Sequence, residues 1–169
     1  SIGTANGLNG VANLAGISAN NSNDVTLTSA TAVTQTVPGV IAAAGLEIKG
    51  TGPFTLANAS NDVVTLAGNV TNGVSYTDSG SVAVGTVNTV GLTACGVDLT
   101  SLTGGTITVS NNIVTTTGGQ VSITNAGALN INANIAADGA VTQNGAGSVI
   151  FGGTGTRSIV TTADDVNFL

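Results

Sequence analysis

Residues 54–69 read FTLANASNDVVTLAGN and contain one short phrase twice, as FTLANA (54–59) and VTLAGN (64–69). In each copy an apolar residue, a threonine and a second apolar residue are followed by small residues and Asn. Apolar residues two positions apart point to the same face of an extended strand, and the residue between them points to the other face. Each copy therefore predicts a short β-strand with one apolar face and one face of hydroxyls or amides.

Four further segments show the same alternation, and Gly and Asn separate them from one another. They are VTLTSA (25–30), ITVSNN (107–112), VSITNA (121–126) and LNINAN (129–134). These segments are short and rich in β-branched residues, which favours strands. Because no useful window carries an apolar stripe of helical period, the sequence predicts an all-β protein of many short strands joined by turns.

Two further repeated segments favour a β-solenoid over a β-sandwich. AVTQ occurs at 32–35 and at 140–143, and SVAVGTV (81–87) resembles GSVIFGG (147–153). Strands of a β-sandwich each meet a different environment, whereas the coils of a solenoid present the same corner repeatedly. We therefore predict a parallel β-helix (β-solenoid) of about seven coils with roughly 20–25 residues each; a β-sandwich is the alternative. Since the copies of the phrase are unequally spaced, we expect them on different faces of a coil.

The chain has 169 residues, enough for one domain with a sizeable core. We assign residues 24–169 to the solenoid repeat domain. Residues 1–23 are the least regular part of the sequence and are expected to form an irregular cap or an extended arm. The chain begins with Ser1, so we expect a processed product or a segment of a longer protein.

Charge and hydropathy argue against nucleic-acid binding and against a membrane-spanning segment. The net charge is −6, with only two Lys and Arg residues, so phosphate backbones are repelled. Tyr76 is the single Tyr or Trp that could stack on a base. The longest weakly polar run, VPGVIAAAGLEI (37–48), is too short to cross a bilayer. We expect neither nucleic-acid binding nor a membrane-spanning segment.

Candidate residues for catalysis or metal binding are few. The chain has no His and one Cys, which leaves little equipment for general acid–base catalysis. Asp164 and Asp165 are adjacent and are expected in a turn, while Lys49 and Arg157 are expected to be solubilising surface cations. GGTGTR (152–157) has Arg where a calcium β-roll needs Asp. We predict no catalytic, cofactor-binding or metal-binding residue, and no cofactor.

The single cysteine, Cys95 in LTACGVDL, cannot form an internal disulfide, so the fold has no covalent staple of this kind. The absence of disulfides does not point to the cytoplasm, because a long regular core needs none. We expect Cys95 to be a small buried hydrophobic residue. An intermolecular disulfide is the alternative, and it applies only if the thiol is exposed.

Residues 45–92, GLEIKGTGPFTLANASNDVVTLAGNVTNGVSYTDSGSVAVGTVNTVGL, resemble the repetitive passenger region of filamentous-haemagglutinin-like exoproteins, giant β-strand-repeat adhesins of Gram-negative bacteria exported by two-partner secretion. GGQVSITNAGALNINANIAADGAVTQ (118–143) is written in the same style, and the similarity covers residues 24–169. The resemblance implies a right-handed parallel β-helix, export through the outer membrane and a cell-surface or matrix role. The family's secretion domain carries an Asn-Pro-Asn-Gly type motif that NGLNG (6–10) does not match, so export is expected of a parent protein. The repeats of this family have no catalytic residues to carry over.

The leading hypothesis is a non-enzymatic extracellular structural protein, located outside the cell or on the bacterial surface. It would serve as a β-helical adhesin stalk or surface-binding segment that contacts glycans or other surfaces through hydroxyl- and amide-rich faces. The alternative is a self-assembling subunit of an extracellular filament, sheath or matrix fibre, in which open coil ends pair between chains. A third class, a carbohydrate-active β-helical enzyme, requires three or more acids clustered on one face.

Overall fold

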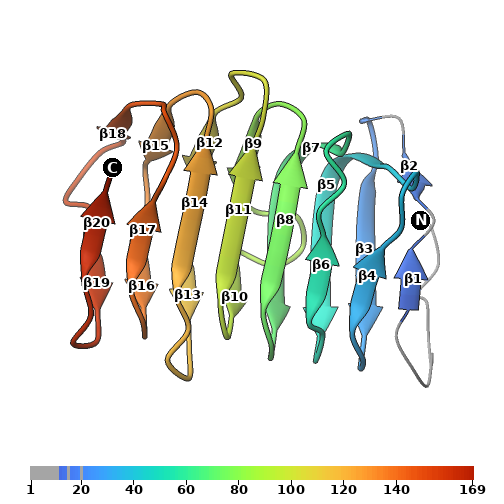
Figure 1. The fold of residues 1–169 in the computed structure, drawn as a ribbon, viewed down its shortest axis with the longest axis horizontal. Helices are drawn as coiled ribbons and strands as arrows, with labels where there is room; N and C mark the ends of the chain where they lie inside the picture. Colours follow the sequence, from blue (N-terminus) through green and yellow to red (C-terminus); the bar gives the residue numbers. More distant parts are fainter. Residues whose placement is uncertain (1–11, 15, 20) are drawn as a thin grey trace.

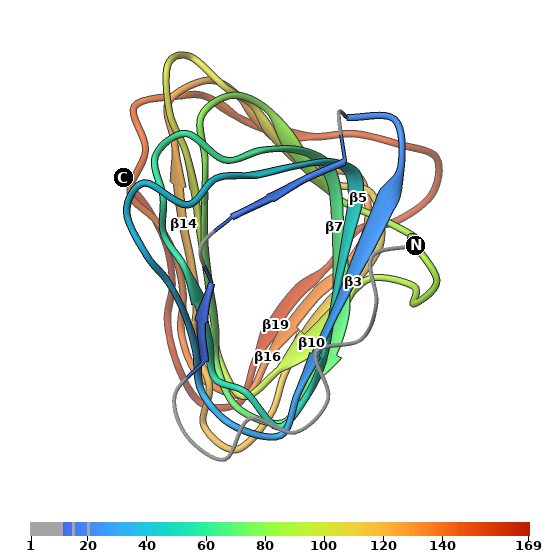
Figure 2. The ribbon, with the colours of Figure 1, turned by 90° about the vertical axis from the view of Figure 1, so that its right-hand side faces the viewer.

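The computed structural model describes residues 12–14, 16–19 and 21–169, and all regular elements in this part are β-strands. The strands wind around one axis into a parallel β-solenoid of about seven turns, which confirms the predicted architecture; the β-sandwich alternative is wrong (Figure 1). Viewed from the N-terminal end, the chain runs clockwise as it recedes, so the coil is right-handed (Figure 2). Among the described residues there is no helix of the length and apolarity that a membrane span requires.

One side of the solenoid is a parallel sheet that we call the front sheet. Its neighbouring strands come from successive coils, in the order β1-β4-β6-β8-β11-β14-β17-β20. The strands are β1 (Ala12–Leu14), β4 (Val33–Gln35), β6 (Phe54–Leu56), β8 (Val74–Asp78), β11 (Val97–Ser101), β14 (Val121–Asn125), β17 (Val141–Gln143) and β20 (Val166–Phe168). Every pairing along this sheet is parallel, because each strand stacks on its counterpart one coil away.

The remaining strands form a twelve-stranded sheet that bends around a corner into a second and a third face. The second face contains β2 (Ile17–Ser18), β9 (Val82–Val84), β12 (Ile107–Val109), β15 (Leu129–Ile131) and β18 (Val149–Phe151). The third face contains β3 (Asp24–Ser29), β10 (Leu92–Ala94), β13 (Ile113–Thr115), β16 (Ile135–Ala137) and β19 (Ile159–Thr161). Two long strands, β5 (Ile41–Gly50) and β7 (Asp62–Val70), run through the corner and join the two faces.

The register gives the length of a coil directly. In the front sheet Phe54 pairs with Val74, twenty residues later, and Val141 pairs with Val166, twenty-five residues later. These are the shortest and longest steps along that sheet, so the predicted coil length is confirmed. The copies of the opening phrase lie on all three faces, as predicted from their unequal spacing: FTLANA begins with β6, VTLTSA lies in β3 and ITVSNN begins with β12.

The core is the lumen of the coil. Inward residues form columns that run along the axis, such as Val82, Ile107 and Leu129 on the second face and Leu92, Ile113 and Ile135 on the third. Val, Ile and Leu fill most of these columns because the lumen is narrow. The front sheet also places two aromatic side chains inside, Phe54 and Tyr76, each 1% exposed.

Polar side chains are buried at the corner where the chain leaves the front sheet. They are Asn61, Asp78, Ser101, Asn125 and Gln143. Each makes hydrogen bonds to backbone or side-chain groups of the same corner, as when Ser101 Oγ donates to the carbonyl of Gly105 and Asn125 Nδ2 donates to that of Gly127. Buried polar groups are tolerated when they are paired in this way, so the corner is fixed by hydrogen bonds as well as by apolar packing.

The predicted cap or arm, residues 1–23, falls largely outside the described residues, since 1–11, 15 and 20 are not among them. Within the described part of that segment, β1 pairs with β4 and β2 pairs with β5. These two strands therefore stack on the coil that follows them.

Candidate functional site

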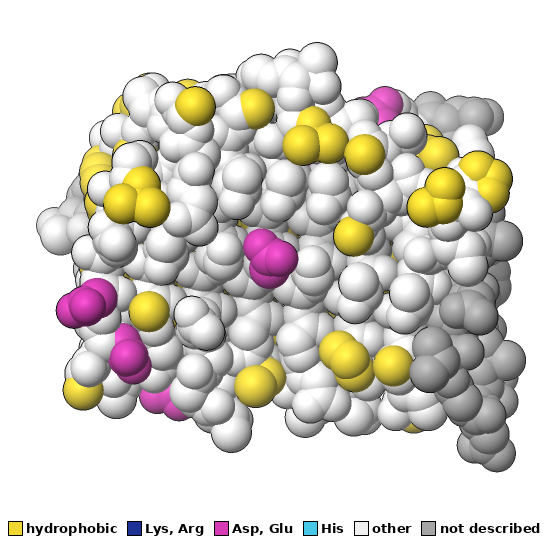
Figure 3. All heavy atoms as spheres, viewed as in Figure 1, with side chains coloured by type: hydrophobic (Ala, Val, Ile, Leu, Met, Phe, Trp, Pro, Cys, Tyr) yellow, Lys and Arg dark blue, Asp and Glu magenta, His cyan; other side chains and the backbone are white. Residues whose placement is uncertain are grey.

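The outer face of the front sheet is polar and carries few charged side chains (Figure 3). Outward residues at one register position form a row across the coils: Thr34, Thr55, Ser75, Asp98, Ser122 and Thr142. All are hydroxyl residues except Asp98. Figure 3, which views the molecule from this side, accordingly shows a mostly uncoloured face with scattered apolar side chains and few acids.

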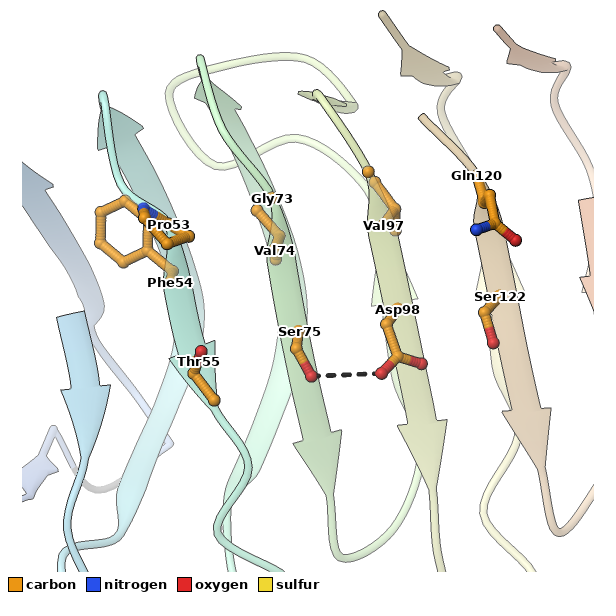
Figure 4. Close-up of a pocket in the computed structure, with 11 residues that line it drawn as sticks. Pro53, Phe54, Thr55, Gly73, Val74, Ser75, Val97, Asp98, Gln120 and Ser122 are labelled. Carbon is orange, nitrogen blue, oxygen red and sulfur yellow. Dashed lines mark hydrogen bonds between the residues drawn. The ribbon is translucent and has the colours of Figure 1, made fainter. Parts of the chain in front are cut away.

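A shallow groove of about 470 Å³ lies on this face, across the first residues of β6, β8, β11 and β14 (Figure 4). Pro53 stands at one end and Gln120 at the other. Between them the same register position is occupied by Gly73 and Gly96, whose missing side chains leave the hollow. The groove runs along the solenoid axis and spans four strands, a length of roughly 14 Å at ordinary strand spacing.

The groove contains one charged group, the exposed carboxylate of Asp98. Ser75 Oγ donates to its Oδ2 at 3.2 Å, and Thr55 and Ser122 continue the hydroxyl row on either side. Among the described residues that line the groove none is positively charged, so no lining side chain neutralises Asp98. The site therefore offers hydroxyl donors and acceptors, an amide and one carboxylate acceptor.

A second polar cluster surrounds Glu47 on the outside of β5. The Glu47 side chain points away from the lumen but is only 1% exposed, because the loop of residues 85–91 between β9 and β10 lies over it. Lys49 Nζ lies 2.8 Å from Glu47 Oε1, and Asn88 Nδ2 donates to Oε2 at 3.0 Å. The hydroxyls of Thr26 and Thr89 also donate to this carboxylate.

Burial by itself would raise the pKa of Glu47, but the hydrogen bonds from Lys49, Thr89, Asn88 and Thr26 outweigh it and lower the pKa from 4.5 to about 2. The donors to the Glu47 carboxylate come from β3, β5 and loop 85–91 of the chain itself. The cluster therefore holds loop 85–91 against the third face through hydrogen bonds.

We expect Glu47→Gln to destabilise the protein by about 2 kcal/mol at pH 7, because an amide cannot accept from all these donors. The pKa of Glu47 is lower in the folded state, so its stabilising contribution is present above about pH 4.5 and is lost as the pH falls towards 2. The difference in Tm between Glu47→Gln and wild type should therefore shrink between pH 5 and pH 2. Asp165→Asn, which alters an exposed turn, is the control and should leave Tm unchanged throughout. A pH-independent difference for Glu47→Gln would contradict the assignment.

Asp78 and Tyr76 form a buried pair inside the coil. Burial raises the pKa of Asp78, although Tyr76 Oη, Val63 N and Gly80 N all donate to its carboxylate. Burial and the neighbouring Asp78 also raise the pKa of Tyr76. A buried acid of raised pKa is typical of some active sites. Here the carboxylate has no exposed surface, so no substrate reaches it and the pair serves to hold the corner.

Of the acids and cations singled out in the sequence, two lie in an exposed turn and two make polar contacts. Asp164 and Asp165 lie in the exposed turn between β19 and β20, as expected. Lys49 is not a free surface cation, because it pairs with Glu47. Arg157 is also not free: it folds back on its own loop, and Nη2 donates to the carbonyl of Thr154 at 2.7 Å.

Cys95 is a free thiol at the corner between β10 and β11 and is only partly buried. The expectation that Cys95 is buried is therefore wrong, because its place at the corner leaves it partly accessible. Its backbone N–H donates to the carbonyl of Asn72 in the preceding coil.

Among the described residues, no three or more His, Cys, Asp or Glu side chains gather in a group that could hold a metal ion. The acids of this part are distributed over different faces and turns: Asp98 on the front sheet, Glu47 under loop 85–91 and Asp78 in the lumen. Among the described residues, the group of three or more acids that the carbohydrate-active alternative requires is therefore not found.

Sequence reasoning missed the groove and the Glu47 cluster. The groove depends on two glycines that become neighbours only through the coil register. For the cluster, the signal was available: Glu47 and Lys49 are two residues apart in LEIKG and so project from the same side of a strand.

Comparison of the chain with protein-family models, with curated proteins and with solved structures finds no match.

Proposed function

We propose that the chain is a non-enzymatic structural segment of an extracellular bacterial protein, acting as an adhesin stalk or as a surface-binding segment. The observation that carries the proposal is the front sheet, which presents a row of hydroxyl side chains at strand spacing over a closed apolar lumen. Every inner strand of this sheet is hydrogen-bonded on both sides, so the surface is rigid. Because the surface is already ordered, it can make many weak contacts without losing further conformational entropy on binding.

Two features of the sequence support the extracellular and bacterial parts of the proposal. Residues 45–92 resemble the passenger region of filamentous-haemagglutinin-like exoproteins. The surface draws its polarity from Thr, Ser and Asn instead of charges, which are only 6% of the residues. This composition is common on large extracellular β-proteins.

The proposal is tested by coating beads with the chain and measuring their retention on glass, on a bacterial lawn and on epithelial cells. Beads coated with serum albumin give the background. On the front sheet, a second register position carries the hydroxyls of Thr77, Thr100 and Thr124, and a triple variant replaces all three residues by Val. The matched control replaces three threonines on the other two faces by Val, namely Thr65, Thr93 and Thr108. We expect retention above background that falls only with the front-sheet variant. Retention at background on all three surfaces would reject the proposal.

A second candidate function, a filament or sheath subunit, is favoured by the C-terminal coil. Phe151 and Phe168 are 54% and 39% exposed, and their rings meet edge to face with centroids 6.3 Å apart. Phe151 pairs in register with Ile131 of the lumen column, so its exposed ring belongs to the surface on which another coil, or another chain, can stack. An apolar strand edge of this kind is a site for pairing with another chain.

If this end mediates association, the apparent mass of the wild-type chain should rise with concentration in light scattering coupled to size exclusion. The double variant Phe151→Ser and Phe168→Ser should then remain monomeric at concentrations where the wild type associates. Val64→Ser, which removes an exposed apolar residue from the wall of the coil, should associate as the wild type does. Monomeric wild type, or association that the double variant leaves unchanged, would argue against this candidate.

A further inference from the structure

The groove of the front sheet combines hydroxyl groups with a single carboxylate, and this combination selects one class of ligand. We infer that the groove binds an uncharged oligosaccharide that lies along the solenoid axis across β6, β8, β11 and β14. The inference rests on the proposed surface-binding function and names the site and the ligand class.

The shape of the groove suits a chain of sugar rings. Its floor at Gly73 and Gly96 is bare backbone, so a flat ring can approach the sheet more closely than elsewhere on this face. Pro53 adds an apolar ring at one end, and Gln120 forms a wall with an amide at the other. Over roughly 14 Å the groove has room for several linked rings in a row.

The hydrogen-bonding groups repeat at the spacing of the strands. Thr55, Ser75 and Ser122 each carry a hydroxyl that both donates and accepts, which is the chemistry that matches sugar hydroxyls. Asp98 Oδ2 already accepts from Ser75, whereas Oδ1 accepts no hydrogen bond from the described residues. A carboxylate can take the protons of two neighbouring hydroxyls, and such charge-assisted bonds are the strong ones.

Other ligand classes fit the groove less well. An anionic ligand would be repelled by the carboxylate of Asp98 and by the net charge of −6, and no described residue that lines the site is a cation. An extended peptide needs free backbone groups to add as a strand. The backbones of β6, β8, β11 and β14 are paired on both sides by neighbouring strands, so none is available.

The register itself supplies test variants that should fold. Gly96 aligns with Gln120 of the next coil, so Gly96→Gln places at residue 96 the side chain that the next coil has at the same register position. The φ of Gly96 is not positive, so its backbone accepts a side chain. Asp98 aligns with Ser75 and Ser122, so Asp98→Ser copies its own neighbours. The first variant fills the groove, and the second removes its charge. Ala136→Gln, on the exposed third face, is the matched control.

Binding is measured by calorimetry with cellotetraose, fully N-acetylated chitotetraose, lacto-N-neotetraose and the sialylated form of lacto-N-neotetraose. We expect the wild type and Ala136→Gln to bind at least one neutral tetrasaccharide, and Gly96→Gln and Asp98→Ser to bind it about tenfold more weakly or worse. The sialylated glycan should bind the wild type less well than its neutral parent, and Asp98→Ser should reduce that difference because the repulsion is removed.

The inference is overturned if no neutral tetrasaccharide binds the wild type at millimolar concentration, or if Gly96→Gln binds as the wild type does. These results are separable from the bead assay. Beads that adhere normally while the groove binds no glycan would leave the surface-binding proposal standing and remove only the oligosaccharide site. Glycan binding that is lost in Gly96→Gln supports the site whether or not the beads adhere.

Discussion

Gly119→Ala is expected to destabilise the solenoid by about 3 kcal/mol or more, because one added methyl group would overlap the backbone of the preceding coil. Gly119 lies in the turn before β14, directly over Cys95. A Cβ atom at Gly119 would fall far inside contact distance of the Cys95 carbonyl oxygen and would also meet the carbonyl oxygen of Thr116 at 2.9 Å. Backbone atoms of a stacked coil cannot move aside as a flexible side chain can, so the turn or the coil spacing has to change.

Thermal unfolding followed by circular dichroism measures this effect. A loss of this size corresponds to a fall of about 10 °C in Tm for a chain of this length. Gly73→Ala is the matched control: its Cβ would have only the Gly96 carbonyl oxygen nearby, at 3.7 Å, and its φ is not positive. Its Tm should stay close to that of the wild type. Equal Tm values for the two variants would mean that the coils are less closely stacked at this corner than the structure has them.

The architecture was predictable because it depends on local alternation and on repetition. The repeated segment AVTQ shows this most clearly, since both copies, 32–35 and 140–143, end in front-sheet strands, β4 and β17. In each the glutamine turns towards a corner asparagine: Gln35 Nε2 donates to Asn61 in the next coil, and Gln143 Nε2 donates to Asn125 in the preceding one. A repeated phrase thus reflects a repeated structural task.

The groove and the Glu47 cluster depended on the register, which the sequence leaves open. Coils of 20 to 25 residues differ in the length of their turns, so residues 73 and 96 become neighbours only once those lengths are known. Loop 85–91 is longer than a turn needs to be, but nothing in its composition says that it folds back over Glu47. Alternation predicts which side of a strand a residue occupies, and it does not predict what covers that side.

Asn61→Ala should be the most damaging change of a polar residue, with an expected loss of about 3 kcal/mol, because Asn61 is fully buried and joins three successive coils. Its Oδ1 accepts from Gln35 Nε2 at 2.6 Å and from the backbone N–H of Ile41 at 2.9 Å. Its Nδ2 donates to the carbonyl oxygens of Leu56 at 3.2 Å and Thr77 at 3.0 Å. Alanine leaves these partners unpaired in a corner that is closed to water, and each buried unpaired group costs about 1–3 kcal/mol.

Asn69→Ala is the control, because it makes the same Asn-to-Ala change at a position without the buried hydrogen bonds of Asn61. Asn69 lies eight residues later on β7, exposed on the outside of the coil, so Asn69→Ala should change Tm by no more than about 2 °C. Proteolysis under native conditions adds a local measurement, because loss of the corner should expose the chain between β6 and β7 before the lumen opens. If Asn61→Ala matched Asn69→Ala in both measurements, apolar stacking alone would hold the coils together. A large loss confined to Asn61→Ala would instead mean that hydrogen bonds at the corner fix how each coil lies on the next.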